Sequence, residues 1–415
     1  MPAAAISRRS AAPAAALLIA LVGCGGASRT RSAAAQQPLP AAGCPAVVRG
    51  TLAAIGRRIY LQAADGGNVV SARRRLARSR ELSRAVAAGD AGATRAALGP
   101  LLKHQIRRIV VRHGAHVLAD IGAGHSLAPV RGVIRDAAAR PVGRYTLTVS
   151  NDRAIAGVTR AVTGAQVLMS RGRRVIVSTL PHAPALRPPR SFVRVGGVRY
   201  TAATFAGTAF PRGRLQVTML LPAAALRTCA PTVAATRAAT VGAVGQRLFA
   251  AESSGAQVQR VLRHVASDGG FRSAVAHDDP QALRRAIVRF FGDRNLHVVR
   301  IRATTAGGRL INDVGGPYVL APAARSVRDA AGRLLGTVTL SVQDDTGYIK
   351  LMQRFTGAAV LLRTPAGQVP GSTLAPGPAT LPGSGVVSYA GRSYEAYSFA
   401  AGAFPSGPLQ ISLLS

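Results

Sequence analysis

The sequence contains the same domain-sized pattern twice. Residues 81–98 (ELSRAVAAGDAGATRAAL) align without a gap with residues 270–287 (GFRSAVAHDDPQALRRAI), at an offset of 189 residues. The phrase AFPRGRLQ at 209–216 matches AFPSGPLQ at 403–410 at an offset of 194. A period of this length is the size of a whole domain and far exceeds a solenoid repeat. The chain is therefore expected to contain two related modules, over residues 45–222 and 230–415.

Residues 1–23 are expected to be an export signal that precedes both modules. Arg8 and Arg9 are followed by a short apolar stretch at 14–22, which is too short to span a bilayer. Cys24 then follows Gly23, which resembles the lipobox of bacterial lipoproteins, and residues 24–44 form a flexible tether. The alternative is an ordinary cleavage site beside an incidental cysteine. The lipoprotein interpretation predicts acylation of Cys24 and a lipid-anchored protein on the extracytoplasmic face of the cell membrane.

The sequence after Cys24 predicts no further membrane segment and no output domain. None of its apolar runs approaches the ~20 residues that a spanning helix needs. The last predicted strand reaches residue 414 of 415, so we expect no cytoplasmic domain after it.

The chain is strongly basic, with a net charge of +37, and Lys103 and Lys350 are its only lysines. The bias toward arginine, alanine and glycine is typical of a GC-rich genome. A surface this basic should nevertheless adhere to anionic headgroups or envelope polymers. Nucleic acid is not the expected partner, because the arginines are scattered and do not alternate with aromatic residues in one patch.

Apart from Cys24, the cysteines are Cys44 and Cys229, which lie at corresponding places just before the first helix of each module. In an oxidising compartment they could form a disulfide that joins the modules. Two free, buried thiols are the alternative, and the sequence alone does not decide between them.

Each module is expected to be α+β, with long helices first and an antiparallel sheet after them. Apolar residues at helical spacing predict helices over 47–63, 69–88 and 91–102, and again over 233–250, 256–276 and 280–291. Period-2 patterns with turn signals then predict strands, and one short helix over 345–355 follows the fourth strand of the second copy. A loop rich in proline and glycine at 364–384 interrupts the strands that follow.

This order resembles the Cache family, the PAS-like extracytoplasmic sensor modules of bacterial chemoreceptors and histidine kinases. The resemblance covers nearly all of both copies. It rests on the helix ends SRAVAAGD at 83–90 and RSAVAHDD at 272–279, on the strand-turn-strand units that end at Asp120 and Asp313, and on the hairpin at 328–345. In that family the first helix continues from a transmembrane segment, whereas a lipid anchor is predicted here. The resemblance therefore implies binding without transmembrane signalling by this chain alone.

The resemblance also implies a ligand site between the concave face of the sheet and the elements that cross it. In the second module the polar residues expected there are Asp313, Tyr318, Asp344, Asp345 and Tyr348. Such carboxylates would pair with an amine or guanidinium group, and the tyrosines would form a flat wall. The structural alternatives are that Asp344 and Asp345 cap the short helix and that Asp313 closes a turn.

The first module retains only part of this set. It has Asp120 and Asp152, but Asn151, Ile155 and His125 replace Asp344, Tyr348 and Tyr318. The second module is therefore the expected binding module.

No metal, cofactor or catalytic motif is recognised in the sequence. His113, His116 and His125 could suggest zinc, but their counterparts in the second copy are not zinc ligands. The chain has no nucleophile elbow, no HExxH and no phosphate-binding loop, so we do not expect an enzyme.

The predicted function is a lipid-anchored sensory protein that binds a small extracellular solute and presents it to a membrane receptor. The carboxylates of the second module predict that this solute carries an amine. The alternative is a structural lipoprotein that binds no ligand and docks on envelope polymers or a partner receptor. An enclosed cavity below Asp313 and Tyr348 would favour the first, and a core filled with side chains the second.

Overall fold

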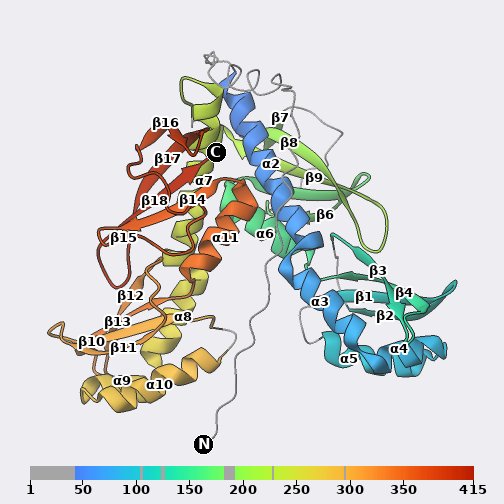
Figure 1. Ribbon diagram of the computed structural model, residues 1–415, viewed down its shortest axis with the longest axis horizontal. Helices are drawn as coiled ribbons and strands as arrows, with labels where there is room; N and C mark the ends of the chain where they lie inside the picture. The colour runs from blue at the N-terminus through green and yellow to red at the C-terminus, as the bar shows by residue number, and fades with distance from the viewer. Residues whose placement is uncertain (1–42, 103–105, 123–126, 182–191, 227–228, 294–295) are drawn as a thin grey trace, which may run out of the picture.

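The computed structural model describes residues 43–102, 106–122, 127–181, 192–226, 229–293 and 296–415 of the 415-residue chain. Both copies show the same order of elements: a helical segment, a four-stranded antiparallel sheet, one helix, and a five-stranded antiparallel sheet (Figure 1). The α+β class, with N-terminal helices followed by antiparallel strands, is confirmed.

Each copy begins with four helices in place of the three expected. They are α2 (Cys44–Asp65), α3 (Gly67–Arg78), α4 (Arg80–Ala87) and α5 (Ala91–Leu102) in the first copy, and α7 (Val233–Ser254), α8 (Ala256–Ser267), α9 (Gly269–Ala276) and α10 (Pro280–Gly292) in the second. The extra break lies at Ser79 and Asp268, which are extended and whose side chains accept the Leu82 and Phe271 backbone N–H groups. A polar N-cap of this kind starts a new helix within an otherwise continuous apolar pattern.

Each copy has two sheets, where the sequence predicted one. In the first copy β1 (Arg108–His113), β2 (His116–Gly122), β3 (Val130–Arg135) and β4 (Pro141–Thr148) pair in the order β2-β1-β4-β3. After α6 (Asp152–Thr163), the strands β5 (Gln166–Arg171), β6 (Arg174–Ser178), β7 (Phe192–Val195), β8 (Val198–Thr208) and β9 (Arg214–Pro222) pair in the order β6-β5-β9-β8-β7, and η1 (Ala223–Leu226) follows.

The second copy repeats both sheets. Strands β10 (Arg300–Thr305), β11 (Leu310–Gly315), β12 (Ala323–Arg328) and β13 (Leu334–Ser341) take the order β11-β10-β13-β12. After α11 (Asp345–Thr356) come β14 (Ala359–Thr364), β15 (Gly367–Gln368), β16 (Ser384–Tyr389), β17 (Arg392–Gly402) and β18 (Pro408–Leu414), in the order β15-β14-β18-β17-β16. The expectation of a single sheet is wrong. Helices α6 and α11 carry the chain away from the four-stranded sheets, so β5 and β14 pair with β9 and β18, the last strands of their copies.

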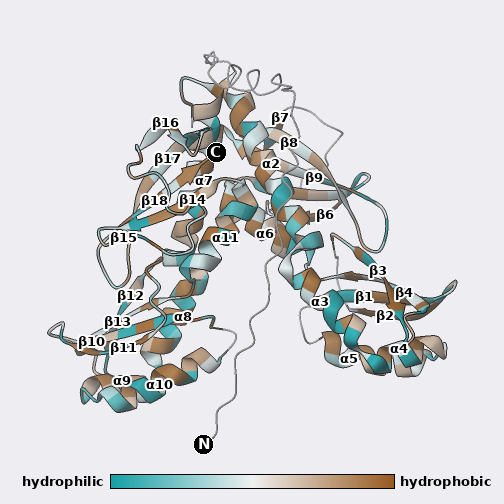
Figure 2. Cartoon of the chain, in the orientation of Figure 1, coloured by the Kyte–Doolittle hydropathy of each residue, from teal (hydrophilic) through white to brown (hydrophobic). Residues whose placement is uncertain are grey.

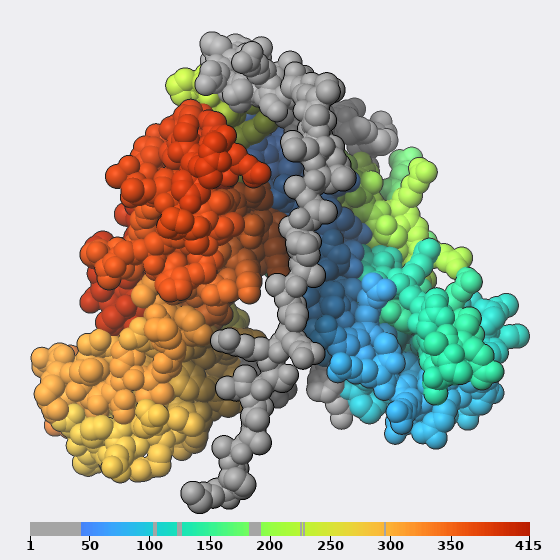
Figure 3. Space-filling model, in the orientation of Figure 1, coloured from blue at the N-terminus to red at the C-terminus, as the bar shows by residue number. Residues whose placement is uncertain are grey.

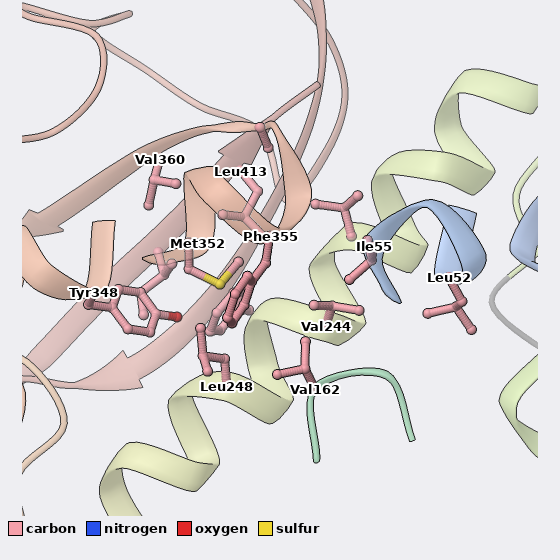
Figure 4. Packing of buried hydrophobic residues seen from close by; sticks show 14 of the residues in the cluster. Leu52, Ile55, Val162, Val244, Leu248, Tyr348, Met352, Phe355, Val360 and Leu413 are labelled. Atoms are coloured by element: carbon pink, nitrogen blue, oxygen red, sulfur yellow. The ribbon is translucent and has the colours of Figure 1, made fainter. Parts of the chain in front are cut away.

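The two copies share one hydrophobic core. It contains Leu52 and Ile55 of α2, Val244 of α7, and Met352 and Phe355 of α11, which face one another in Figure 4. The inserted helix of each copy packs on the long helix of the other, α6 on α7 and α11 on α2. The copies are thus related as the two halves of a pseudo-symmetric pair.

The long helices come close to each other and to the sheets because small residues line them. A Cβ atom at Gly56, Gly242 or Gly245 would collide with side chains of the five-stranded sheets, at Met219, Tyr397 and Leu413 respectively. Glycine therefore sets the packing distance at these positions.

A disulfide joins Cys44, the first residue of α2, to Cys229 in the segment before α7, with a Cα–Cα distance of 5.7 Å. Of the two alternatives that the sequence left open, the structure contains the bonded pair. Both long helices begin near this bond and diverge from it, and the four-stranded sheets lie at the two far ends (Figure 1). In the space-filling view the copies form two lobes that separate toward those ends (Figure 3).

Each four-stranded sheet has a core of its own, separate from the shared one. Helices α3 to α5 cover one sheet and α8 to α10 the other, through two distinct sets of buried apolar residues. These short helices carry both hydrophilic and hydrophobic residues, as amphipathic helices do (Figure 2). Among the described residues, no helix is both long and apolar enough to span a membrane.

The shared core predicts that residues 230–415 do not fold as an independent unit. Removal of the first copy would expose the apolar surfaces of α7 and α11 that α2 and α6 now cover. We expect this fragment to bind a hydrophobic dye and to melt over a broad range, measured by fluorescence and circular dichroism.

The chain from residue 38 onward with Cys44→Ser and Cys229→Ser is the matched control, since it lacks the disulfide but keeps the shared core. A sharp melt of the fragment at the temperature of this control would show instead that each copy is self-sufficient.

Candidate functional site

Asp313, one of the five expected ligand-binding residues, forms an internal ion pair. It lies on β11 and accepts two hydrogen bonds from Arg300 of β10, at 2.9 and 2.8 Å, and both side chains are only 18% exposed. Arg300 also donates to the Tyr318 carbonyl at 3.0 Å, and its guanidinium lies 4.4 Å from the centre of the Phe404 ring. Arg300 therefore brings Asp313 and the backbone of Tyr318 together by binding to both.

The two aspartates at the start of α11 also have structural partners. Asp344 is the N-cap and accepts the Gly347 N–H at 2.6 Å. Asp345 is buried and accepts the backbone N–H groups of Val319 and Leu320, at 3.1 and 2.9 Å. Burial raises the pKa of Asp345, while these hydrogen bonds lower it. Asp345 thus holds the segment after Tyr318 against α11.

Tyr348, one turn along α11 from Asp344, lies inside the shared core and is fully buried. Its hydroxyl donates to the Gly245 carbonyl of α7 at 3.3 Å, and burial raises its pKa strongly. Figure 4 shows its ring among core side chains, next to Met352. Ligand contact by these five residues stays a prediction. Of the structural alternatives, the helix cap is present at Asp344 only, whereas Asp345 binds backbone N–H groups and Asp313 pairs with Arg300 between two strands.

The first copy repeats the same arrangement. Arg108 donates to Asp120 at 3.0 and 2.9 Å and lies 5.0 Å from the centre of the Phe210 ring. Asn151 is the N-cap of α6 and accepts the Ala154 N–H. His125 lies outside the described residues.

Both copies therefore contain what we call the Arg–Asp–Phe bracket: Arg108, Asp120 and Phe210, or Arg300, Asp313 and Phe404. The bracket connects each four-stranded sheet to the turn before the last strand of its five-stranded sheet. Sequence reasoning found the aspartates and missed the arginines and phenylalanines. The repeated phrase AFP at 209–211 and 403–405 was the available signal.

A cavity of about 330 Å³ adjoins the bracket in the first copy. It lies on the face of the sheet that turns away from α3 to α5, and the turn between β8 and β9 closes one side. Its lining residues are Val110, Arg112, Val117, Asp120, Arg131, Gly132, Arg144, Tyr145, Thr146, Pro211 and Arg212.

Four arginines dominate the electrostatics of this cavity. Arg112 lies directly opposite Arg144 in the register of β1 and β4, and Arg131 pairs with Thr146 on the next strand. Like charges directly opposite each other on a sheet are destabilising. Asp120 is the only carboxylate among the described residues of the lining, and it is already paired with Arg108. Among the hydrogen bonds and ion pairs of the described residues, none involves the side chain of Arg131, Arg144 or Arg212.

The second copy lacks these arginines. The register of its strands places Thr304, Thr337 and Ala324 at the positions of Arg112, Arg144 and Arg131, and Ser406 replaces Arg212. The bracket is common to both copies, whereas the arginine-lined cavity belongs to the first.

The histidines of the first copy contribute no metal site within the described residues. His113 Nδ1 lies 2.9 Å from the Val142 carbonyl oxygen. In the described part of the chain, no three His, Cys, Asp or Glu side chains are grouped so that they could hold a metal ion.

Replacement of Asp345 by alanine should lower the free energy of unfolding, because two backbone N–H groups would lose their acceptor. We expect a loss of about 1–3 kcal/mol, measured by urea denaturation. Asp345→Asn, which keeps one carbonyl oxygen, should lose less. Unchanged stability of Asp345→Ala, with loss of ligand affinity, would restore Asp345 as a ligand contact.

Comparisons with known proteins find one distant structural likeness. No protein-family model matches the chain, and no curated protein matches it. Among solved structures, the chain is similar to the LuxQ periplasmic domain of Vibrio cholerae, with 10% sequence identity and a TM-score of 0.26. That match covers 44% of this chain and 98% of the LuxQ domain.

Proposed function

We propose that this protein is an extracytoplasmic, lipid-anchored binding protein whose first module takes a small anionic solute. The observation that carries the proposal is the cavity of about 330 Å³ with four arginines around it. The Cys44–Cys229 disulfide supports an oxidising compartment. The lipobox-like sequence before Cys24 supports acylation of that residue.

The charge of the cavity favours an anion. Arg112, Arg131, Arg144 and Arg212 converge on it, and a bound carboxylate or phosphate would relieve their mutual repulsion. Guanidinium groups bind both anions in a bidentate manner. The volume is at the low end for ligand pockets, so the ligand is expected to be small.

An amine-bearing ligand in the second module remains the alternative site proposal. It would require Asp313 to exchange Arg300 for the ligand, or Asp345 to release two backbone N–H groups. Loss of its partner would leave Arg300 partly buried and unpaired, which is costly. An anion in the first module requires no such exchange, and is therefore better supported.

The second candidate function is an interaction protein that binds no solute. It is favoured by the net charge of +37 and by the filled core around Tyr348. In that case the lobes would dock on envelope polymers or on a partner receptor. In the binding-protein proposal, a membrane receptor would instead recognise the solute-bound form.

Replacement of Cys24 by serine should release the protein from membranes, because the protein would then lack the acyl chains that anchor it. Membrane and aqueous fractions of cells that express each form provide the measurement, with Cys229→Ser as a control that keeps Cys24. Retention of Cys24→Ser in the membrane fraction would refute the lipid anchor.

Small anions should bind the chain from residue 38 onward, and this binding should depend on the arginines of the first-module cavity. We expect a dicarboxylate such as succinate, or inorganic phosphate, to raise the melting temperature. Arg131→Gln with Arg144→Gln should weaken that binding by about tenfold or more, because each removes a charge-assisted hydrogen bond. Isothermal titration calorimetry measures the affinity.

Arg57→Gln with Arg95→Gln is the matched control, because it removes the same charge from exposed positions of the first copy. Equal weakening by both pairs would show that binding reflects net charge only. If only amines raised the melting temperature, the binding site would instead be assigned to the carboxylates of the second module.

A further inference from the structure

The second module has a different arginine-lined recess, which we call the α8–β12 groove. It lies between the end of α8, the start of α9 and the strand β12, and its volume is about 730 Å³. Its lining residues are Arg263, His264, Ala266, Ser267, Arg272, Arg325, Ser326 and Arg328. It is more than twice the volume of the cavity in the first module and is open to solvent.

Among the residues that the structure describes, no carboxylate lines this groove. The nearest acidic residue in sequence is Asp268, which has partners outside the groove. Its Oδ1 atom accepts a hydrogen bond from the Phe271 N–H at 2.7 Å and pairs with Arg289 at 3.2 Å. Arg328 donates to the Gly332 carbonyl at 2.8 Å. In the described part of the chain, no hydrogen bond or ion pair involves the side chain of Arg263, Arg272 or Arg325. The groove therefore presents guanidinium groups whose charge the protein does not balance.

The first copy keeps arginine at two of the four groove positions, Arg74 for Arg263 and Arg135 for Arg328, and lacks it at the other two. Ser83 corresponds to Arg272 in the aligned helix ends, and Gly132 corresponds to Arg325 in the register of the strands. The arginine positions of the two copies have thus diverged around a common fold. The groove and the cavity of the first module are separate features of separate lobes.

We propose that the α8–β12 groove binds consecutive phosphate groups of an anionic polymer, such as a polymer of glycerol phosphate. Arg263, Arg272, Arg325 and Arg328 are the ligands, and Ser267 and Ser326 add hydroxyl groups beside them. An open groove with several unbalanced guanidinium groups fits a chain of phosphodiesters better than it fits one enclosed ion.

The position of the groove favours a polymer over the lipid surface. Helices α7 and α8 together lead from the disulfide to the groove, which corresponds to roughly 50 Å of helix. Figure 1 shows α8 and β12 at the end away from the start of α2, where the predicted tether joins. This choice rests on the proposed anchoring through Cys24, whereas the phosphate chemistry of the groove does not.

The test measures binding of a glycerol-phosphate polymer to the chain from residue 38 onward at several salt concentrations. Arg263→Gln with Arg325→Gln changes two exposed residues of the groove, so the fold should persist. We expect this pair to weaken binding by about tenfold or more and to reduce its salt dependence. Arg272→Gln gives a second, independent variant, and circular dichroism with thermal melting verifies the fold of each.

Two further variants make the result specific. Arg284→Gln with Arg392→Gln removes the same charge from exposed positions of the second module and should leave polymer binding unchanged. Arg131→Gln with Arg144→Gln should also leave it unchanged, so that failure of the groove and failure of the first-module site are distinguishable. Equal weakening by the groove pair and the Arg284/Arg392 pair would overturn the proposal in favour of diffuse charge.

Vesicles that contain phosphatidylglycerol and free inorganic phosphate complete the test. The proposal expects both to compete poorly with the polymer. Vesicles that bind more tightly than the polymer and depend on Arg263 and Arg325 would assign the groove to lipid headgroups and overturn the polymer assignment. Full occupancy by inorganic phosphate at similar affinity would reduce the groove to a site for a single ion, which would also overturn it.

Discussion

The packing of the long helices against the opposite copy is the constraint on which the rest of the structure depends. Residues at positions 48, 52, 55 and 59 form one buried stripe along α2, and this stripe joins a cluster that also contains α7 and α11. Neither long helix buries its apolar side within its own copy alone. The disulfide holds the first residue of α2 close to the segment that precedes α7. The glycines on α2 and α7 allow these helices to approach the sheets closely. The duplication therefore produced an intramolecular pair, in which each half completes the core of the other.

This shared core explains why the two halves kept their fold while their recesses diverged. The Arg–Asp–Phe bracket recurs in both copies with the same two-hydrogen-bond pairing, because it connects the outer sheet to the inner one. The outer surfaces of the four-stranded sheets carry no such constraint. Near them the first copy has Arg131 and Arg144 on its strands, and the second has Arg272 on α9 and Arg325 on β12. This difference supports the proposal that the two lobes bind different anions.

Local sequence signals predicted the order of elements well. Most of the helix ranges, and the cap at Asp344 that was one of two alternatives for that residue, depend on contacts between residues close in sequence, which patterns report. The split into two sheets depends on pairing between strands far apart in sequence, such as Gln166 with Leu220 and Ala359 with Leu414. The packing of α6 on α7 and of α11 on α2 depends on contacts between the copies, and no local pattern encodes either feature. The site prediction failed to anticipate the partners for the same reason. Asp313 is recognisable in sequence, but its neutralisation by Arg300 depends on strand register, and Tyr348 faces the core because α7 lies beneath α11.

The distribution of charge also favours the binding of anions. Only 16 acidic residues accompany 53 basic ones, and several of the acidic residues are engaged inside the protein. Asp120 and Asp313 pair with arginines, Asp268 and Asp344 cap helices, and Asp345 binds backbone N–H groups. These five carboxylates therefore do not neutralise the arginines of the first-module cavity and the α8–β12 groove. Any anion that binds there in the folded state and not in the unfolded chain raises the free energy of unfolding by mass action. Because the lobes share one core, stabilisation gained in either recess opposes global unfolding of the whole pair.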